Sequence, residues 1–420
     1  MTVLEDIRSG NINPDDLNAD LFEGTKNKIL SGIKKSIKVD VTAIDYSTQD
    51  YNFLSQIRSN VYAFAGAKTR QQLNDMRNML LDDKGNVVSF SEFQKKTDEY
   101  RKNVMGLNEQ YNKTWLETEY NTAIAQAQSA AAWKEYEANK DLYPNLRYVT
   151  AGDEHVRSSH AILDGIVKSI DDPVWNTISP VKDWNCRCRL EPTDDVAHDG
   201  PLPKGFNPNP VFKGNVGKTG SIFSEKHPYF KKNRIDKLKV QKAVDGYWAK
   251  ERAAINRAIY NDYADDAAYV QELFNQETGG FIVRHTNAQY LPAQRPPAES
   301  DIINKLVQKG NRVVIPEYQQ VPYTKNFDLS IDGADWDIKT ISGDVKRKTE
   351  ERIKDAMQQA DNVILHFEEQ PDINEIRRGL GNVKKEARLN AVMIMFEDVV
   401  AVISKAEITR KDFKALNLLK

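Results

Sequence analysis

The chain has 420 residues, a length that predicts two to three domains. Hydrophobic residues make up 40% and charged residues 29%, as in ordinary globular proteins, and the formal net charge of −2 excludes a strong overall attraction to nucleic acid or membranes. No stretch reaches the roughly 18 apolar residues of a membrane span, and the first residues lack the basic start and apolar run of a signal peptide, so we expect synthesis in the cytoplasm.

The N-terminal part of the chain is predicted to be mostly helical. Three long segments rich in Ala, Gln, Glu and Lys carry apolar residues near helical spacing: Leu54–Leu80, Ser91–Met105 and Leu107–Asn139. The third helix ends near Tyr143-Pro144, because proline disfavours helix at the residue before it. A short strand at 147–150 is expected to follow.

Two motifs come next in the chain. The first is Asp153-Glu-His-Val-Arg-Ser-Ser-His-Ala-Ile-Leu-Asp-Gly165, and the second is Trp184-Asn-Cys-Arg-Cys-Arg189, with Asp171-Asp-Pro-Val-Trp175 between them. Their content and order resemble the phage Mu F-like minor head protein family over residues 51–230. The resemblance implies a head-morphogenesis protein that associates with portal and capsid proteins and is later found in the virion.

The first motif places polar residues at intervals of four, three and four. If the segment is a helix, they form one polar stripe: Asp153, Arg157, His160 and Asp164. Cys186 and Cys188 are the two cysteines of the chain, which favours a metal or free-thiol role over a disulfide framework. Two interpretations stay open. Either His160, Asp164, Cys186 and Cys188 hold a structural zinc ion, or buried cysteines pack beside a His/Asp/Arg hydrogen-bond network.

The middle of the chain changes composition twice. Residues 194–226 are rich in Gly, Pro and Asn, which predicts an irregular loop or arm. Residues 231–276 have helical composition, and Leu291–Ala298 is a proline-rich, semi-rigid linker. The predicted organisation is a 1–50 N-terminal extension, a 51–230 Mu F-like domain, a 231–290 helical connector, the 291–298 linker and a 299–420 C-terminal domain.

The segment Asn326–Lys339 predicts a tight hairpin around the two-residue turn Asp332-Gly333. In that register Asp328 falls directly opposite Asp337. One face of the hairpin is then apolar: Phe327, Leu329, Ile331, Ala334, Trp336 and Ile338. The other face carries Asp328, Asp337 and Lys339. Opposed carboxylates repel, so a divalent cation between them would stabilise the pair. A solvated polar face above a packed one is the alternative.

This hairpin resembles the core of the PD-(D/E)xK nuclease superfamily, with Asp328 as one acid and Asp337-Ile338-Lys339 as the acid-x-lysine element. The predicted order of helix, strand, hairpin, helix and strand from 299 to 367 fits that core. In detail, residues 299–420 are similar to nuclease domains of contact-dependent inhibition toxins, several of which cut tRNA. The predicted fold class is multidomain α+β, with a mainly helical N-terminal domain and a restriction-endonuclease-like mixed sheet flanked by helices.

The resemblance implies roles for individual residues. Asp328 and Asp337, with Glu299 or the Ile338 carbonyl, would hold Mg²⁺ or Mn²⁺, and Lys339 would orient a water or neutralise the phosphate. Gln359 and Glu299 occupy accessory positions of the superfamily. Four basic residues could contact the phosphate backbone: Lys346, Arg347, Lys348 and Arg352. A solvated helix face explains the same four residues equally well.

The combined prediction is a phage minor head protein that carries a C-terminal metal-dependent nuclease toxin. Its expected partners are portal and capsid proteins, nucleic acid with tRNA favoured over DNA, and an immunity protein, with no membrane. Two alternatives remain. One is a structural capsid protein whose C-terminal domain is an inactive, nuclease-like binding module, and the other is a nuclease that acts on DNA.

Overall fold

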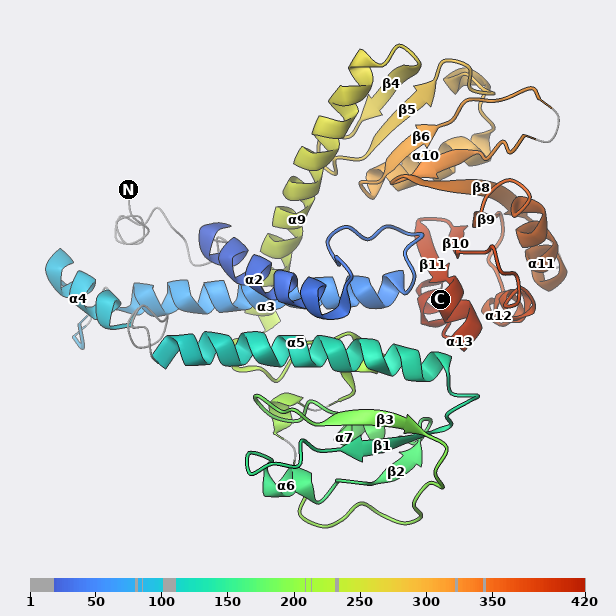
Figure 1. The fold of residues 1–420 in the computed structure, drawn as a ribbon. Coiled ribbons are helices and arrows are strands. Elements are labelled where there is room, and N and C mark those ends of the chain that lie inside the picture. The colour runs from blue at the N-terminus through green and yellow to red at the C-terminus, as the bar shows by residue number, and fades with distance from the viewer. Residues whose placement is uncertain are drawn as a thin grey trace. The chain divides into compact units, whose positions relative to one another are not determined.

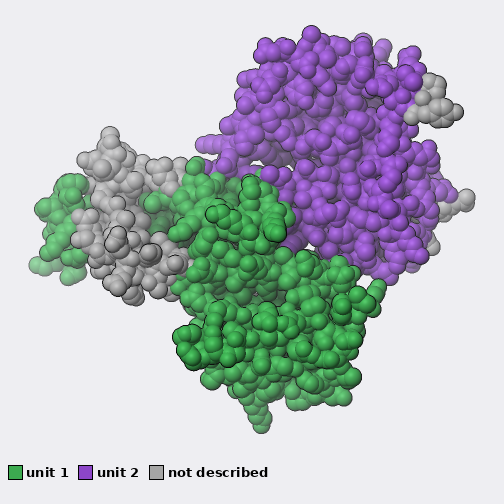
Figure 2. All heavy atoms as spheres, viewed as in Figure 1, with its two compact units in different colours: residues 1–42, 55–244 green, residues 43–54, 245–420 purple. Residues whose placement is uncertain are grey.

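The computed structural model describes residues 19–79, 82–84, 86–100, 111–207, 209–212, 214–230, 234–321, 324–342 and 345–419. The chain divides into two compact units, coloured separately in Figure 2. Unit 1 comprises Met1–Thr42 and Ser55–Val244, and unit 2 comprises Ala43–Leu54 and Asp245–Lys420. The predicted multidomain α+β class is confirmed in this coarse form.

The N-terminal part of unit 1 is helical, as predicted (Figure 1). Its helices are α2 (Ala19–Ile37), α3 (Tyr51–Asn78), α4 (Phe90–Tyr100) and α5 (Tyr111–Ala138), and the first residues of α3 belong to unit 2. Lys68 of α3 and Glu119 of α5 form an ion pair with both side chains buried. Two predicted helix boundaries, the end of the second helix at Met105 and the start of the third at Leu107, lie outside the described residues. The first 18 residues of the expected N-terminal extension also lie outside them.

A small antiparallel sheet follows the helices of unit 1. Its strands are β1 (Asn145–Val149), β2 (Val167–Ser169) and β3 (Arg189–Thr193), in the order β2-β1-β3. Trp133 of α5 packs in one cluster with Leu146, Tyr148 and Trp175. The predicted strand at 147–150 is therefore the centre of a sheet, and two connecting helices, α6 (Ser158–Ala161) and α7 (Trp175–Ile178), are only four residues long.

The remaining described part of unit 1 is irregular, as its Gly, Pro and Asn content predicted. It holds single turns of helix: η2 (Pro210–Phe212), α8 (Val216–Thr219) and η3 (Pro228–Phe230). Asn60 of α3 fixes this arm, because its amide accepts a hydrogen bond from the Phe223 backbone N–H and donates one to the Phe223 carbonyl. Phe223 stacks on Phe64 with ring centroids 3.6 Å apart. Helix α9 (Arg234–Asp262) follows and continues into unit 2.

Unit 2 is built on an eight-stranded mixed sheet, in the order β11-β10-β9-β8-β7-β6-β5-β4. The strands are β4 (Tyr269–Phe274), β5 (Phe281–His285), β6 (Arg312–Ile315), β7 (Leu329–Ile331), β8 (Ala334–Ile341), β9 (Asn362–Phe367), β10 (Ala391–Phe396) and β11 (Val399–Ser404). The pairs β5/β6, β8/β9 and β9/β10 are parallel. The other pairs are antiparallel.

The sheet separates two hydrophobic clusters because successive strand residues face opposite sides. Ile364 packs with helix α10 (Pro297–Gln308), whereas its neighbours Val363 and Leu365 pack with helices α11 (Val345–Ala356) and α12 (Ile373–Asn382). Tyr46 and Tyr51 pack on the α10 side, which explains why segment 43–54 belongs to this unit. The last helices are α13 (Lys405–Arg410) and η6 (Lys414–Leu419).

The predicted helical connector differs from the structure. Its first part is helix α9, but its second part forms strands β4 and β5 of the large sheet. Gly280 allows this, because a Cβ there would lie 2.0 Å from the Val307 carbonyl oxygen of α10. The proline-rich segment contains η5 (Pro292–Gln294) and the start of α10, so it lies inside unit 2 rather than before it.

Among the described helices, none is both long and apolar enough to cross a lipid bilayer.

Candidate functional site

The predicted hairpin is present with the predicted register. Asp332 and Gly333 both have positive φ, 53° and 98°, as a two-residue type I′ turn requires. Ile331 pairs with Ala334 and Leu329 with Trp336, and the Asp328 N–H donates to the Trp336 carbonyl at 3.1 Å. Asp328 therefore lies opposite Asp337.

The turn is tied to the neighbouring strand by the Asp332 carboxylate. It accepts hydrogen bonds from the Arg312 backbone N–H at 3.0 Å and from the Asn311 side-chain amide at 2.8 Å. The Arg312 guanidinium also donates to this carboxylate at 3.2 Å and to the Asp332 carbonyl at 3.0 Å. A residue in the left-handed region thus also anchors the hairpin to β6, which fixes where the two strands can lie.

The predicted apolar face is confirmed with one exception. Leu329, Ile331, Trp336 and Ile338 are buried in the cluster under α10, and Ala334 packs against it. Phe327 is instead half-buried beside Ser330 and Asp335, on the other side of the sheet. Strand β7 begins only at Leu329, so strict alternation does not extend back to Phe327.

The Asp328 carboxylate takes the place of a backbone carbonyl as hydrogen-bond acceptor for β8. Strand β8 extends beyond Leu329, the first residue of β7, so that β7 offers no backbone partner to the Ile338 N–H. The Asp328 Oδ2 atom accepts this N–H at 2.6 Å. Burial raises the pKa of Asp328, and this hydrogen bond from Ile338 works in the opposite direction.

Asp337 is a buried carboxylate beside a lysine. The side chain belongs to a residue that is only 2% exposed. The Asp337 Oδ2 lies 2.5 Å from the Lys339 Nζ, and the two groups form an ion pair. Both side chains face away from Trp336 and Ile338, because they alternate with them along β8. Burial, and then the charge of Asp328, raise the pKa of Asp337 to about 6.

Glu299 lies in the first turn of α10 and lines a small pocket together with Asp328. Burial raises the pKa of Glu299 to about 7; the charges of Asp328 and, to a smaller extent, Asp337 act in the same direction, and Arg295 opposes them. The charge of Asp328 thus raises the proton affinity of both Asp337 and Glu299 at the place where β7 and β8 part.

These residues fit a hard divalent cation. Oxygen donors are the ligands that Mg²⁺ and Mn²⁺ prefer, and the three carboxylates are buried or half-buried with Lys339 as the cation paired with Asp337. A cation would offset the cost of burying the three carboxylates, which is the main cause of their raised pKa values, and the repulsion of Asp337 and Glu299 by Asp328. The fit is not tight, because one oxygen from each of Glu299, Asp328 and Asp337 do not all come within 4.8 Å of one another among the described residues.

Gln359 holds the chain just before Asp328. Helix α11 ends at Ala356, earlier than predicted, and Gln359 lies in the turn that follows. Its Oε1 accepts the Asn326 backbone N–H at 2.8 Å. Gln359 therefore contacts the segment that positions Asp328.

The four predicted phosphate-binding residues lie on α11. Lys348 Nζ donates to the Ser342 carbonyl, and Arg352 is exposed. The side chains of Lys346 and Arg347 lie outside the described structure. The helix carries Glu350, Glu351 and Asp355 as well, so both earlier interpretations of this basic cluster stay open.

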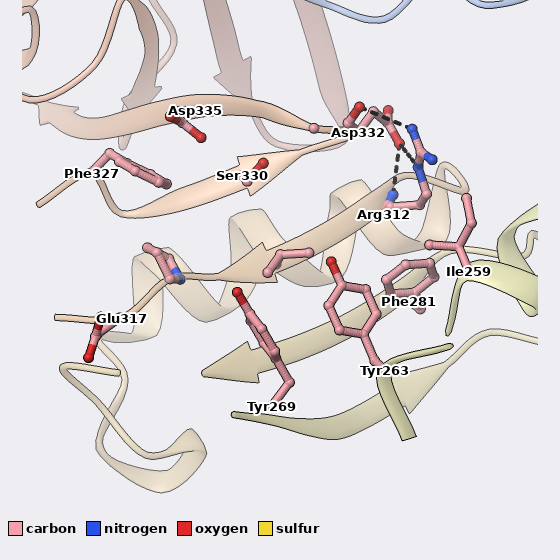
Figure 3. A pocket seen from close by; sticks show the side chains of 13 residues that line it. Ile259, Tyr263, Tyr269, Phe281, Arg312, Glu317, Phe327, Ser330, Asp332 and Asp335 are labelled. Atoms are coloured by element: carbon pink, nitrogen blue, oxygen red, sulfur yellow. Dashed lines mark hydrogen bonds and ion pairs between the residues drawn. The ribbon is translucent and has the colours of Figure 1, made fainter. Parts of the chain in front are cut away.

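A larger pocket of about 340 Å³ opens on the face of the hairpin that carries Ser330 and Asp335, opposite the face packed under α10 (Figure 3). Three aromatic side chains, Tyr263, Tyr269 and Phe281, stand along one wall, and Ser330 and Asp335 lie on the opposite strands. None of the residues predicted to be catalytic lines it. No local pattern in the sequence predicts this pocket, because its walls come from α9, η4 (Tyr263–Asp265) and five strands.

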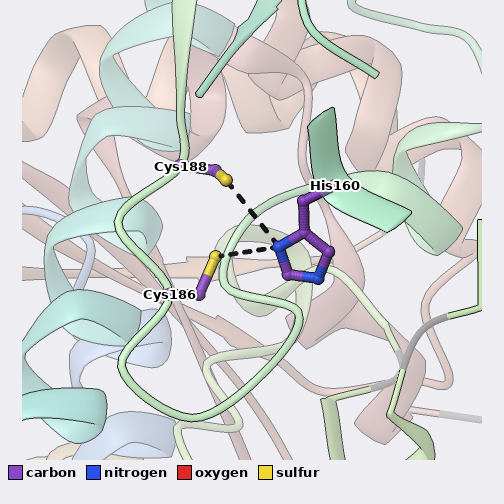
Figure 4. Close-up of side chains that lie close together, drawn as sticks. All are labelled: His160, Cys186 and Cys188. Atoms are coloured by element: carbon purple, nitrogen blue, oxygen red, sulfur yellow. Dashed lines mark hydrogen bonds between the residues drawn. The ribbon is translucent and has the colours of Figure 1, made fainter. Parts of the chain in front are cut away.

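In unit 1 the structure brings His160, Cys186 and Cys188 together (Figure 4). The His160 Nδ1 lies 3.7 Å from the Cys186 Sγ and 3.8 Å from the Cys188 Sγ. The predicted fourth ligand, Asp164, does not join them. Its Oδ1 instead accepts hydrogen bonds from the Thr150 N–H at 2.7 Å and hydroxyl at 2.9 Å.

The predicted helical stripe in this motif is wrong. Helix α6 covers only Ser158–Ala161, and Arg157 has extended backbone angles. The polar residues of the motif each contact a different partner. Asp153 forms a double ion pair with Arg187, with both distances 2.7 Å, and Arg157 Nε lies 2.8 Å from Asp183. The first motif is thereby joined to the cysteine-bearing loop.

Two family models match different parts of the chain. Residues 87–191 match the Phage Mu protein F like protein family, and residues 325–399 match the contact-dependent growth inhibition CdiA C-terminal domain. Both resemblances are confirmed. The first match contains the His160 and cysteine cluster. The second contains Asp328, Asp337, Lys339 and Gln359, and it begins after Glu299.

Individual relatives cover smaller shares of the chain. The Mu-like prophage FluMu F protein of Haemophilus influenzae is 39% identical over 82 residues, which are 20% of either protein. The putative capsid assembly protein F of Escherichia phage Mu is 30% identical over 129 residues, 29% of either protein. The chain thus spans less than a third of the length of these relatives. A solved CdiA-CT/CdiI toxin and immunity complex from Burkholderia pseudomallei is similar over 28% of this chain and 96% of its own, with 20% identity and a TM-score of 0.22.

Proposed function

We propose that this chain is a phage head-associated protein whose C-terminal unit is a metal-dependent nuclease toxin, with RNA, most of all tRNA, as its substrate. The observation that carries the proposal is the arrangement of Asp328, Asp337 and Lys339 at the point where β7 and β8 part. The CdiA C-terminal family match over 325–399 supports the toxin assignment.

The order of elements supports the finer assignment to a restriction-endonuclease-like fold. Helix α10, strand β6, the β7/β8 hairpin, helix α11 and strand β9 follow one another as in the PD-(D/E)xK core. Strands β4 and β5 extend the sheet on one side, and β10 and β11 extend it on the other. Asp337 lies on β8 and Asp328 immediately precedes β7, which supports a match to the acids of that superfamily.

The chemistry follows from the charges of the site. Asp328 and Asp337, with Glu299, would hold Mg²⁺ or Mn²⁺, which supplies Lewis-acid polarisation of a phosphodiester when bound. Lys339 keeps a positive charge at the Asp337 carboxylate, where it can neutralise a phosphate oxygen. Gln359 fixes the backbone ahead of Asp328. The residues thus divide between holding charge, binding the phosphate and maintaining the geometry.

The proposed setting comes from unit 1 and its relatives. One relative is described as a putative capsid assembly protein, which supports association with capsid and portal proteins and a place in the virion. A cell that makes an active nuclease needs protection from it, so we include an immunity protein among the partners. That partner would bind unit 2 before the protein reaches its target.

The test uses the full chain. A fragment from residue 299 onward would lose β4, β5 and segment 43–54, all of which belong to unit 2. The purified protein is incubated with total tRNA and with plasmid DNA, with Mg²⁺ or with EDTA. Asp337→Asn is the test variant and Asp335→Asn the matched control, since Asp335 is exposed and lies two residues away on the same strand.

We expect Mg²⁺-dependent tRNA cleavage that falls about 100-fold or more in Asp337→Asn and is unchanged in Asp335→Asn. The free energy of unfolding of Asp337→Asn at pH 7 without metal should equal or exceed that of the wild type, because a buried, repelled charge is removed. Cleavage of DNA but not of tRNA would contradict the RNA assignment and show that the substrate is DNA. Equal activity in both variants would place catalysis elsewhere, and no cleavage by the folded chain would favour an inactive binding domain.

A further inference from the structure

The His160, Cys186 and Cys188 cluster lies in unit 1 and has no part in the proposed nuclease. One potential ligand atom from each of the three side chains lies within 4.8 Å of the other two. The described residues contain no other group of three or more His, Cys, Asp or Glu side chains arranged in this way. We propose that these three residues bind a zinc ion, which fixes the cysteine-bearing loop to the segment that carries His160.

The distances match the edges of a metal tetrahedron. With Zn–S near 2.3 Å and Zn–N near 2.0–2.1 Å, neighbouring S and N ligands of a tetrahedral zinc lie about 3.6 Å apart. The Nδ1 atom of His160 is 3.7 Å and 3.8 Å from the two sulfurs. Figure 4 shows this nitrogen directed at the space between them. Small shifts of the side chains are enough to close the site on an ion.

Hydrogen bonding alone does not explain this symmetry. A single ring nitrogen carries either one proton or one lone pair, so it can satisfy one sulfur well and not two. Nδ1 is nevertheless almost equally distant from both sulfurs. A cation between the three atoms satisfies them all. This argument favours the zinc interpretation of the two that the sequence left open.

The surrounding residues hold the three ligands in place before any ion binds. The double ion pair of Asp153 with Arg187 and the pair of Arg157 with Asp183 join the motif that carries His160 to the loop 183–188. Asn185 adopts a left-handed conformation with φ 54°, and its backbone N–H donates to the Thr122 hydroxyl of α5. The loop is thus fixed on both sides of Cys186.

The chemical character of the pocket selects a soft metal. His160 and Cys186 are buried and Cys188 is half-buried, within clusters that include Trp175 and Phe212. Thiolate and imidazole ligands favour zinc over Mg²⁺ or Ca²⁺. When zinc binds, the two thiols release their protons to solvent. The ion then offsets the charge of both thiolates.

Tyr148 supports the fourth coordination position. It is fully buried, and its hydroxyl lies within hydrogen-bonding reach of Cys188. Three protein ligands leave one position of the tetrahedron to solvent. The Tyr148 hydroxyl can donate to a thiolate or to that solvent molecule.

The experiment measures metal in the full chain, purified from cells grown with added zinc and without chelator. Inductively coupled plasma mass spectrometry should find about one zinc per chain in the wild type. Cys186→Ser and Cys188→Ser should each fall to a tenth of that content or less. Asp164→Asn is the matched control and should keep full content, because Asp164 bonds Thr150 instead. Asp337→Asn should also keep it, which separates this site from the nuclease site.

A second measurement protects the test against variants that fail to fold. The wild-type chain is stripped of metal and titrated with Co²⁺, which should give the visible bands of tetrahedral cobalt and a thiolate charge-transfer band, both displaced by Zn²⁺. Added Zn²⁺ should also slow alkylation of the two thiols. Absence of zinc, no cobalt bands and equal alkylation rates in a folded chain would overturn the proposal in favour of a hydrogen-bonded network. Zinc retained in both serine variants would overturn the ligand assignment.

Discussion

The two clusters of chemically reactive side chains are built in different ways. In unit 2, one two-residue turn places Asp328 opposite Asp337, so two of the three carboxylates of the site come from a single hairpin. In unit 1, His160 comes from a four-residue helix and the cysteines from a loop 26 to 28 residues later, and ion pairs join the two segments.

The comparison teaches which geometry can be read from a sequence. Turn chemistry and strand alternation fix a hairpin register over short distances. An irregular segment that closes on another through side-chain contacts has no period to read. The two sites also differ in the interactions that hold their residues in place. The hairpin site is held by backbone pairing whether or not it binds a cation, whereas the cysteine loop is held by side chains around a site with soft ligands.

The electrostatics of the hairpin site can be tested through the pH dependence of cleavage. The raised pKa values of Asp337, about 6, and Glu299, about 7, mean that the acids of the site hold protons at pH values where ordinary carboxyls do not. Metal binding needs the ionised forms. At limiting Mg²⁺ we therefore expect cleavage to fall about tenfold or more per pH unit below pH 6, and saturating Mg²⁺ should move this limb to lower pH. A limb near pH 4 at limiting metal would contradict the electrostatics of the site.

The same shift has a consequence for stability without metal. Asp337 has a higher pKa in the folded than in the unfolded protein, so the folded state binds more protons between about pH 4 and pH 6. The stabilisation is present below pH 4 and is lost as the pH rises through 6. Urea unfolding of unit 2 should show a smaller loss in Asp337→Asn than in the wild type, because Glu299 and Asp328 keep raised pKa values in the variant.

A smaller effect tests whether the hairpin site depends on anything beyond the hairpin. Gln359 accepts a hydrogen bond from the Asn326 backbone, and its neighbour Gln358 is exposed. Gln359→Ala should lower kcat for tRNA cleavage about 3- to 10-fold, because the loss of one hydrogen bond is worth roughly 0.5–1.5 kcal/mol. Gln358→Ala should leave kcat unchanged.

The KM for tRNA gives the second readout in that experiment. If Gln359 only positions Asp328, kcat falls while KM stays near its wild-type value. A rise in KM alone would assign Gln359 to substrate binding. Equal kinetics in both variants would show that the Asn326 backbone keeps its place without the side chain.

Much of unit 2 was predictable because its elements have clear periods. The hairpin register, the helix at α10 and the strands β6, β9, β10 and β11 follow from alternation and turn residues. Strands β4 and β5 were missed because Tyr269–Phe274 follows a long helical segment without a proline between them, and its alternation is interrupted by a bulge between Gln271 and Leu273. Their strand conformation depends on the pairing of β5 with β6 and of β4 with β5, contacts that no local pattern encodes.

Unit 1 was predictable to a lesser degree. The long helices were visible from composition, and the two motifs were identified from their residues. The helical stripe failed because intervals of four and three also occur by chance in irregular chain, where each polar residue finds its own partner. Asp164 shows the cause. Its carboxylate is used by Thr150, a residue that precedes the motif, and this removes it from the cluster around His160.

The turn from which the hairpin comparison starts can be tested through the stability of unit 2. Gly333 has φ 98°, and a Cβ added there would meet nothing within 4 Å, so any cost of Gly333→Ala comes from the backbone. We expect a loss of about 1–2 kcal/mol in the free energy of unfolding of unit 2. Gly381→Ala is the matched control. Gly381 lies in α12 with the same open surroundings but without positive φ, so alanine should stabilise by up to about 1 kcal/mol. Urea unfolding measures both variants, and equal effects of the same sign would show that the Asp332-Gly333 turn does not set the register that brings Asp328 to Asp337.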